Sequence, residues 1–194
     1  MDTGSRSHLG LLLAPGAGAD RDQPALVAID RAAAGLGVEV VRMDFPYRRA
    51  GRKAPDRPPV LLQAVLDEAA QLAPRCETLV LGGRSMGGRV CSLAVAEGLP
   101  AAGLLLVSYP LHPPGKPDKL RTQHFPDIAV PCLFVSGTKD AFGTPGELEA
   151  ATSSIPGHVT HVWIEGGDHS LRRADQAVVE ASMQWLGHLG LPGA

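Results

Sequence analysis

The sequence is poor in aromatic residues, has little net charge and contains no long hydrophobic run. Aromatic side chains make up only 4% of its 194 residues, so few large rings are available to enclose a long apolar ligand. No apolar run approaches the roughly 18 residues that cross a membrane, and residues 1–8 lack the apolar core of a signal peptide. The formal net charge of -2 gives no reason to expect a nucleic acid or an anionic membrane as a partner.

Cysteine is also scarce. Cys76, Cys91 and Cys132 lie at the start of apolar runs or inside them, and their spacing resembles no metal-ligand pattern. An odd number of such cysteines predicts reduced, buried thiols and a cytoplasmic location. We therefore expect neither a metal site nor a cofactor.

Short apolar runs alternate with segments of helical periodicity along the whole chain. The expected strands are residues 9–14, 38–44, 78–81, 103–107, 132–137 and 159–164. The expected helices are residues 24–34 and 60–73, a segment between Ser85 and Gly98, a segment that begins at Thr144, and residues 174–189. Continuously apolar strands that alternate with helices predict one α/β domain over residues 1–194. It would have three layers, with about six mainly parallel strands and helices on both faces.

The stretch Gly83-Arg84-Ser85-Met86-Gly87 has the Gly-x-Ser-x-Gly spacing of a nucleophile elbow. It follows an apolar strand and precedes a helix. Glycine is needed in such a turn because the chain is strained and neighbouring backbone passes close by. Ser85 is therefore the candidate nucleophile, although a glycine-rich turn that merely contains a serine would have the same short pattern.

Asp140 and His169 follow later strands, and ligands in parallel sheets bind at the carboxyl ends of strands. A serine needs a base with a pKa near neutrality, and the histidine needs an acceptor on its other nitrogen. The order Ser85, Asp140, His169 is that of α/β hydrolases. Asp168 and Glu165 are rival acids, but residues so close to His169 in sequence rarely reach its Nδ1 atom.

Other residues are candidates for the oxyanion hole and for substrate contacts. The amides of Ala17, after the first strand, and Met86, at a helix start, are the expected oxyanion donors, and Gly16 would lie beside them. His112 follows the fourth strand and is a candidate lining residue.

The segment 45–59 is rich in proline and in basic residues and is predicted to be a loop. We expect Arg48, with Arg49, Arg52 and Lys53 nearby and Arg84 next to the nucleophile, to bind a carboxylate or phosphate of the substrate. A solvated basic loop with no ligand is the alternative.

Two nucleotide-binding patterns fit poorly. The residues Gly16-x-Gly18-x-x-Arg21 imitate a dinucleotide fingerprint but have arginine in place of the third glycine. The stretch 82–89 lacks the Lys-Ser/Thr pair of a phosphate-binding loop.

Several motifs together resemble a small, capless α/β-hydrolase family that is distantly similar to dienelactone hydrolases and includes the hydrolase-like region of a chromatin-complex scaffold subunit. These motifs are residues 13–18, 44–48, 82–89, 109–117, 137–140 and 166–169. The resemblance implies the Ser85, Asp140, His169 triad and a sheet that lacks the leading antiparallel hairpin. Such proteins often have histidine where this chain has Pro15. Some members of the family serve as protein-interaction modules.

The expected function is therefore that of a serine hydrolase with an acyl-enzyme mechanism. The connection 108–131 contains six prolines and is too short for a helical cap domain, so the site should be open and suited to a small or polar ester or thioester. The alternative is a non-catalytic interaction module on the same fold. The expected partner is a small-molecule ester, without nucleic acid or membrane, and the sequence does not indicate an oligomeric state.

Overall fold

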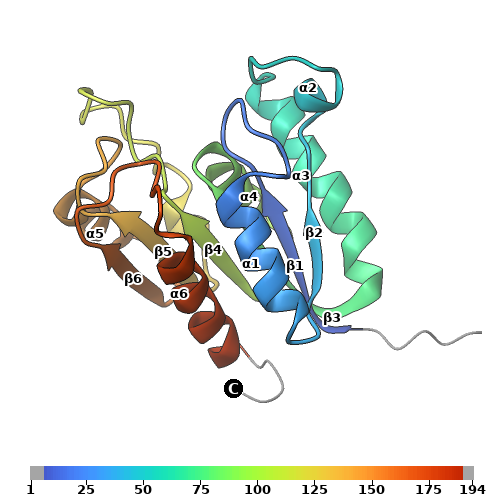
Figure 1. Cartoon of the computed structure of the whole chain (residues 1–194). Coiled ribbons are helices and arrows are strands. Elements are labelled where there is room, and N and C mark those ends of the chain that lie inside the picture. Colours follow the sequence, from blue (N-terminus) through green and yellow to red (C-terminus); the bar gives the residue numbers. More distant parts are fainter. Residues whose placement is uncertain (1–6, 190–194) are drawn as a thin grey trace, which may run out of the picture.

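The computed structural model describes residues 7–189, whose strands form one sheet (Figure 1). The sheet has six strands in the order β2-β1-β3-β4-β5-β6, and every neighbouring pair is parallel. The strands are β1 (Ser7–Ala14), β2 (Glu39–Arg42), β3 (Cys76–Arg84), β4 (Gly103–Val107), β5 (Cys132–Gly137) and β6 (Val159–Ile164). The predicted parallel α/β sheet is confirmed.

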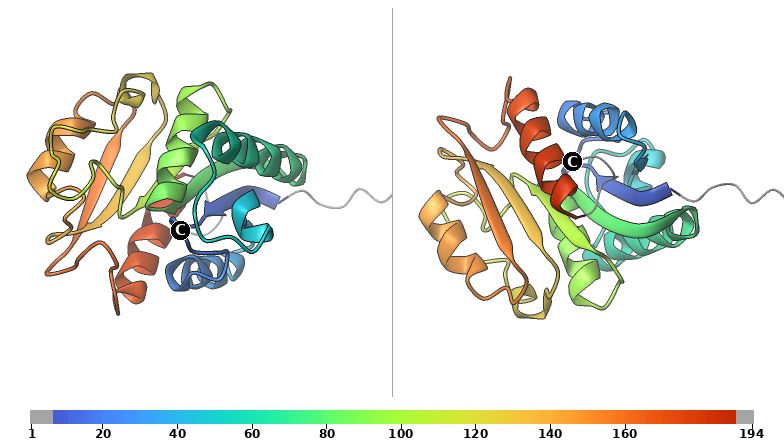
Figure 2. Two further views of the ribbon diagram at one scale, coloured as in Figure 1. Left: turned by 90° about the horizontal axis from the view of Figure 1, so that it is seen from above. Right: turned by 90° about the horizontal axis from the view of Figure 1, so that it is seen from below.

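Helices cover both faces of the sheet, as Figure 2 shows. On one face α1 (Pro24–Ala34) packs against α6 (Asp175–His188). On the other face lie α3 (Pro58–Leu72), α4 (Met86–Ala96) and α5 (Pro145–Thr152). The start of α5 is a capping box, in which Thr144 accepts from the Glu147 amide and the Glu147 carboxylate accepts from the Thr144 amide. The expected three layers are therefore present.

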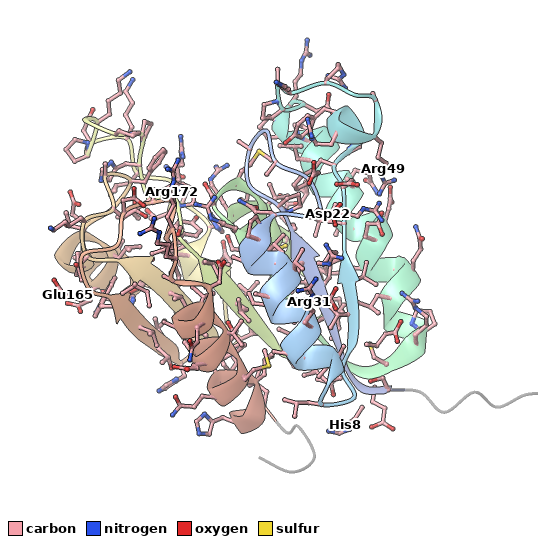
Figure 3. The ribbon with its side chains drawn as sticks, in the orientation of Figure 1. His8, Asp22, Arg31, Arg49, Glu165 and Arg172 are labelled. Atoms are coloured by element: carbon pink, nitrogen blue, oxygen red, sulfur yellow. The ribbon has the colours of Figure 1, made fainter. Side chains whose placement is uncertain are left out.

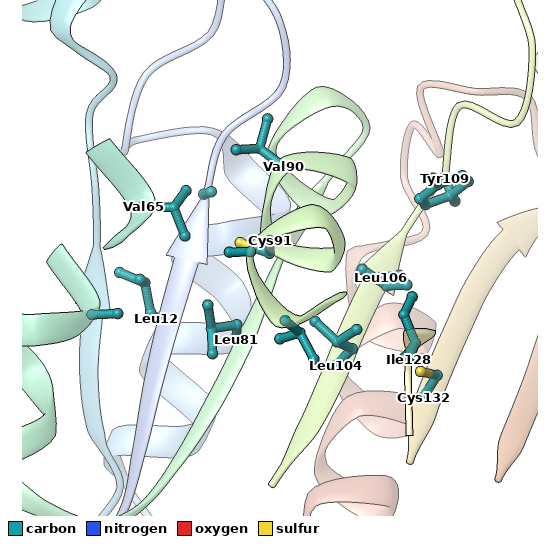
Figure 4. Packing of buried hydrophobic residues seen from close by; sticks show 14 of the residues in the cluster. Leu12, Val65, Leu81, Val90, Cys91, Leu104, Leu106, Tyr109, Ile128 and Cys132 are labelled. Carbon is teal, nitrogen blue, oxygen red and sulfur yellow. The ribbon is translucent and has the colours of Figure 1, made fainter. Parts of the chain in front are cut away.

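The strands are apolar on both sides because each side faces a helical layer. Leu12, Leu81 and Leu104 belong to the cluster beneath α3 and α4 (Figure 4). Their chain neighbours Leu11 and Val80 belong to the cluster beneath α1 and α6. Cys76, Cys91 and Cys132 are buried and form no disulfide among the described residues, in agreement with the predicted buried thiols.

Several element boundaries differ by one or two residues from the expected ranges, and two segments differ by more. Segment 45–59 is not a continuous loop, because residues Pro46–Arg49 form the short helix α2. Pro46 occupies a first-turn position, where its fixed φ favours a helix and its missing amide hydrogen costs nothing. Strand β3 also continues through both Gly82 and Gly83 to Arg84, so the turn into α4 is confined to Ser85.

Among residues 7–189, no cap domain covers the sheet. The connection 108–131 contains only one short 3-10 helix, η2 (Phe125–Asp127), and a second such turn, η1 (Ala73–Arg75), precedes β3. Within residues 7–189, no helix combines the length and the apolar composition that crossing a membrane requires.

Candidate active site

The candidate site lies at the carboxyl edge of the sheet, the upper edge in Figure 1. Ser85 follows β3, Asp140 follows β5 and His169 follows β6. All six strands run in the same direction, so the ends of β3, β5 and β6 reach the same edge. The topology thus brings together residues that are separated by as many as 84 positions in sequence.

The turn at Ser85 is strained. Its φ is 51° and its ψ is -117°, a backbone region that non-glycine residues seldom occupy. A Cβ atom added at Gly83 would lie 2.3 Å from the carbonyl oxygen of Ala14, and one added at Gly87 would lie 2.2 Å from the same atom. The close backbone approach that the sequence predicted for these glycines is confirmed.

The three polar side chains form a chain of hydrogen bonds. Ser85 Oγ lies 2.9 Å from His169 Nε2, and His169 Nδ1 lies 2.8 Å from Asp140 Oδ2 and 3.0 Å from Asp140 Oδ1. Asp140 is 2% exposed and also accepts the Phe142 amide at 2.8 Å. The rival carboxylate of Asp168 instead accepts from the amide and hydroxyl of Ser170. In this arrangement the histidine can take the serine proton while the buried carboxylate orients the ring.

A cavity of about 490 Å³ opens beside Ser85. The ring of Phe142 stacks on the imidazole of His169, with centroids 4.0 Å apart, and so covers one face of the histidine. The cavity is lined by Ala17, Leu61, Arg84, Ser85, Met86, Arg89, Pro110, Arg121, Phe142 and His169.

The turn after β1 presents one free amide to this cavity. The Gly16 amide donates to Gln23 Oε1 and the Gly18 amide donates to the Tyr47 hydroxyl, both at 3.0 Å. The amides of Ala17 and Met86, which both line the cavity, have no hydrogen-bond acceptor in the part of the chain that the structure describes. The turn is therefore held by the amides on either side of Ala17. Gly16 is bound to Gln23 and does not line the cavity.

Arg84 lines the cavity but binds another part of the protein. Its guanidinium donates to the carbonyl oxygen of His169, and it lies close to Gly16. Burial lowers the pKa of Arg84, although Asp140 and two other carboxylates oppose that change. These contacts link the turn after β1 to the histidine loop.

The expected contact between Arg48 and substrate has no support in the geometry. Arg48 does not occur among the described residues that line the cavity, and it donates to Asp20 at 3.0 Å. Asp20 lies in the turn after β1, and the hydrogen bond to Arg48 is the main reason its pKa falls below the ordinary value. With Tyr47, Arg48 thus binds α2 to the turn that carries Ala17.

The neighbouring arginines of the basic segment are also paired. Arg49 binds Glu68, and Arg52 binds Asp56 at 2.7 Å. Figure 3 shows Arg49 on the outer flank of the molecule, beside α3. The charges of Arg48, Arg49 and Arg52 are therefore compensated by the protein's own carboxylates, whereas Lys53 has no ion pair among the described residues.

His112 also lies outside the cavity as described. It is 4% exposed, its Nδ1 lies 2.9 Å from the carbonyl oxygen of Pro113, and its Nε2 lies 3.5 Å from a Glu147 carboxylate oxygen. Within residues 7–189, no group of three or more His, Cys, Asp or Glu side chains could hold a metal ion.

Sequence reasoning missed five lining residues, namely Leu61, Arg89, Pro110, Arg121 and Phe142. Arg89 had a usable signal, because it follows Ser85 by four positions and so lies one helical turn along α4. Arg121 had none, since it lies within the irregular connection 108–131.

Comparisons with known proteins agree with this description. Residues 7–186 match the family model for the alpha/beta hydrolase domain. The structure is similar to Est1E from Butyrivibrio proteoclasticus, with a TM-score of 0.79, 15% identity, and coverage of 97% of this chain and 90% of that chain. It is also similar to a monoacylglycerol lipase of Paleococcus ferrophilus, with a TM-score of 0.78, 15% identity, and coverage of 96% and 97%.

A dienelactone hydrolase from Anabaena variabilis is a third similar structure, with a TM-score of 0.74 and 17% identity. That match covers 95% of this chain and 88% of the hydrolase. At these identities the likeness concerns the fold, whereas the family match spans nearly all of the described residues. On that match, the chain belongs to the alpha/beta hydrolase domain family.

Proposed function

We propose that this protein is a serine hydrolase that cleaves a small or polar carboxylic ester or thioester through an acyl-enzyme. The observation that carries the proposal is the hydrogen-bonded chain from Ser85 through His169 to the buried Asp140, at a strained strand-to-helix turn. A serine hydroxyl is a weak nucleophile until an adjacent base removes its proton, and this geometry provides that base.

In the first half of the reaction, Ser85 Oγ attacks the substrate carbonyl carbon while its proton passes to His169 Nε2. The bond to the leaving alcohol or thiol then breaks, and His169 returns the proton to the leaving group. In the second half, a water attacks the acyl-enzyme and gives its proton to His169. The acid is released and Ser85 regains its proton. Asp140 holds the imidazole tautomer and stabilises its protonated form.

The amides of Ala17 and Met86 would stabilise the oxyanion. The other two amides of the Gly16–Gly18 turn are occupied, so Ala17 alone is left to donate into the cavity. The Met86 amide lies at the first turn of α4, where the helix dipole also favours negative charge.

The open site favours small or polar substrates. A cavity of about 490 Å³ that no cap covers leaves a long acyl chain largely exposed to solvent. Its lining includes three arginines, which also suit a polar ligand better than a fatty one.

The proposal is tested by labelling the purified protein with a fluorophosphonate probe and by following p-nitrophenyl acetate hydrolysis. Labelling should be lost in both Ser85→Ala and His169→Ala, with at least a roughly thousandfold fall in hydrolysis rate. Ser154→Ala and His188→Ala remove an exposed serine and an exposed histidine and serve as matched controls. Labelling that persists in Ser85→Ala would contradict the assignment.

A folded wild-type protein that resists labelling would instead favour the non-catalytic interaction module. The resemblance to a chromatin-complex scaffold region and the cytoplasmic location stay predictions that the structure does not bear on.

A further inference from the structure

Two arginines reach the cavity beside Ser85 from different segments. Arg89 lies in the first turn of α4, four residues after the serine, and Arg121 comes from the connection between β4 and β5. The Arg89 amide donates to the Ser85 carbonyl oxygen at 3.0 Å, and both residues line the cavity. Arg89 is therefore placed next to the nucleophile.

Neither arginine has an acidic partner within residues 7–189. The Arg89 Nε atom is buried without any hydrogen-bond acceptor, and the side chain of Arg121 donates only to the carbonyl oxygen of Pro110, at 3.3 Å. No aspartate or glutamate occurs among the described lining residues. Both arginines are half-buried, and partial burial of a cation without a counter-charge is costly, so an anion bound between them would be stabilised.

The electrostatics show that the two charges act on the same region. Arg89 contributes to a lowered pKa of Arg121, after the larger effect of burial. Arg89 contributes in the same way, again after burial, to a pKa of about 4 for His124, whose Nε2 lies 2.8 Å from Ser92 Oγ. His124 thus adds no positive charge at neutral pH, and it supplies no anion.

The site is also held in place before any ligand arrives. The Arg121 amide donates to the Leu111 carbonyl at 2.8 Å, and the Arg121 carbonyl accepts from the buried Tyr109 hydroxyl at 2.9 Å. Arg89 is part of α4 and its carbonyl accepts from Ser92 Oγ at 2.8 Å. These contacts fix the backbone from which both arginine side chains extend, so the loop and the helix need no rearrangement when an anion binds.

We propose that Arg89 and Arg121 together bind a carboxylate carried by the substrate, so that the substrate is a short ester or thioester with a free carboxylate a few bonds from its scissile carbonyl. This inference rests on the proposed serine hydrolase function and names its substrate class. It moves the anion site from the segment after β2, where the sequence suggested it, to the start of α4.

The test compares matched esters that differ by a negative charge. Monoethyl succinate is paired with ethyl butyrate, and 4-acetoxybenzoate with its methyl ester, so that the carboxylate lies on the acyl side or the alcohol side. For at least one pair, wild-type kcat/KM should favour the anionic ester by roughly tenfold or more. That ratio should fall about tenfold or more in Arg89→Gln and in Arg121→Gln.

Two further variants complete the design. Arg89→Lys keeps the charge but not the planar fork, so it should retain an intermediate ratio. Arg75→Gln removes an exposed arginine that pairs with Glu39 at the opposite edge of the sheet, and it should keep the wild-type ratio. Fluorophosphonate labelling and the melting temperature of each variant show that it is folded and that Ser85 is still reactive.

The outcomes separate this inference from the proposed function. If wild type is labelled and prefers neither anionic ester, or if the ratio survives both glutamine substitutions, the inference is overturned while the serine hydrolase stands. If the wild-type protein is not labelled, the anion site is tested by measuring glutarate binding to Ser85→Ala with isothermal titration calorimetry. Binding that Arg89→Gln weakens tenfold supports the anion site without catalysis, and no binding overturns it.

Discussion

Two groups of arginines differ sharply in this molecule. In the segment after β2, Arg48, Arg49 and Arg52 each pair with a carboxylate. Around Ser85, Arg89 and Arg121 have no such partner within the described residues. The first group is conspicuous in the sequence and is neutralised in the structure, whereas the second is scattered and uncompensated.

The difference shows what a run of basic residues can and cannot indicate. A local excess of charge predicts an anion site only if no carboxylate folds against it, and α2 brings Arg48 against Asp20. The carboxylates that compensate this segment come from the turn after β1, from α3 and from the segment itself. Which arginines remain without a counter-charge therefore depends on the ion pairs of the folded protein and not on the number of basic residues in a segment.

The largest expected effect comes from His124, which lies within the field of Arg89. Burial, and to a smaller extent Arg89, lower the pKa of His124 from 6.5 to about 4. Between these two pH values the imidazole is protonated in the unfolded chain and neutral in the folded protein. Stability is thus complete above about pH 6.5 and should fall by about 3 kcal/mol as the pH drops to 4. Urea unfolding of wild type and His124→Gln at several pH values measures this loss of stability. The variant should lose less stability than wild type between pH 6.5 and 4.

Arg89, whose charge causes part of the lowered pKa of His124, provides a control. In Arg89→Gln the pKa of His124 should rise, and the drop in stability should become smaller. In Arg49→Gln, on the paired segment, the drop should be that of wild type. If wild type, Arg89→Gln and Arg49→Gln lost the same unfolding free energy between pH 6.5 and 4, the two groups of arginines would not differ in their effect on His124.

Arg84→Ala should have the next largest effect, because it removes the donor to the His169 carbonyl. If the proposed hydrolase mechanism holds, Arg84 would position His169, and misplacing the imidazole should lower kcat about a hundredfold. KM should change much less, and Arg84→Lys should recover part of kcat. A rise in KM with unchanged kcat would show instead that Arg84 binds substrate.

A smaller effect is expected on stability when the uncompensated charge is removed. Arg89→Met should raise the free energy of unfolding by about 1 kcal/mol, because the buried Nε without an acceptor is replaced by an apolar group. Chemical denaturation at pH 7 measures this. A loss of stability would mean that Arg89 is compensated within the folded chain.

The smallest effect is expected on the paired segment. Arg52→Gln removes an ion pair with Asp56 in which the arginine side chain is 54% exposed. Such a pair contributes about 0.2–1 kcal/mol, and the difference from wild type should shrink further in high salt. A loss well above this range would indicate that the segment contributes more to the fold than its surface ion pairs suggest.

Much of the fold and the arrangement at Ser85 could be predicted from local patterns. The residues Val80 and Leu81 indicated a buried strand, and Gly83 and Gly87 indicated a turn without room for side chains, which the close approach to Ala14 confirms. His169 and Asp140 were selected because they follow strands, and the structure brings them to hydrogen-bonding distance of one another. Short helices such as α2 were missed because a four-residue helix has no periodicity to detect.

The sequence by itself determined the order of strands and helices, the elbow around Ser85 and the candidates for its polar partners. These depend on apolar periodicity and on steric limits, which act between residues close together in the chain. Only the tertiary structure decided which arginines are neutralised and which face the cavity. Ion pairing depends on distances between segments that are remote in sequence, such as Arg48 and Asp20, and those distances exist only after the chain has folded.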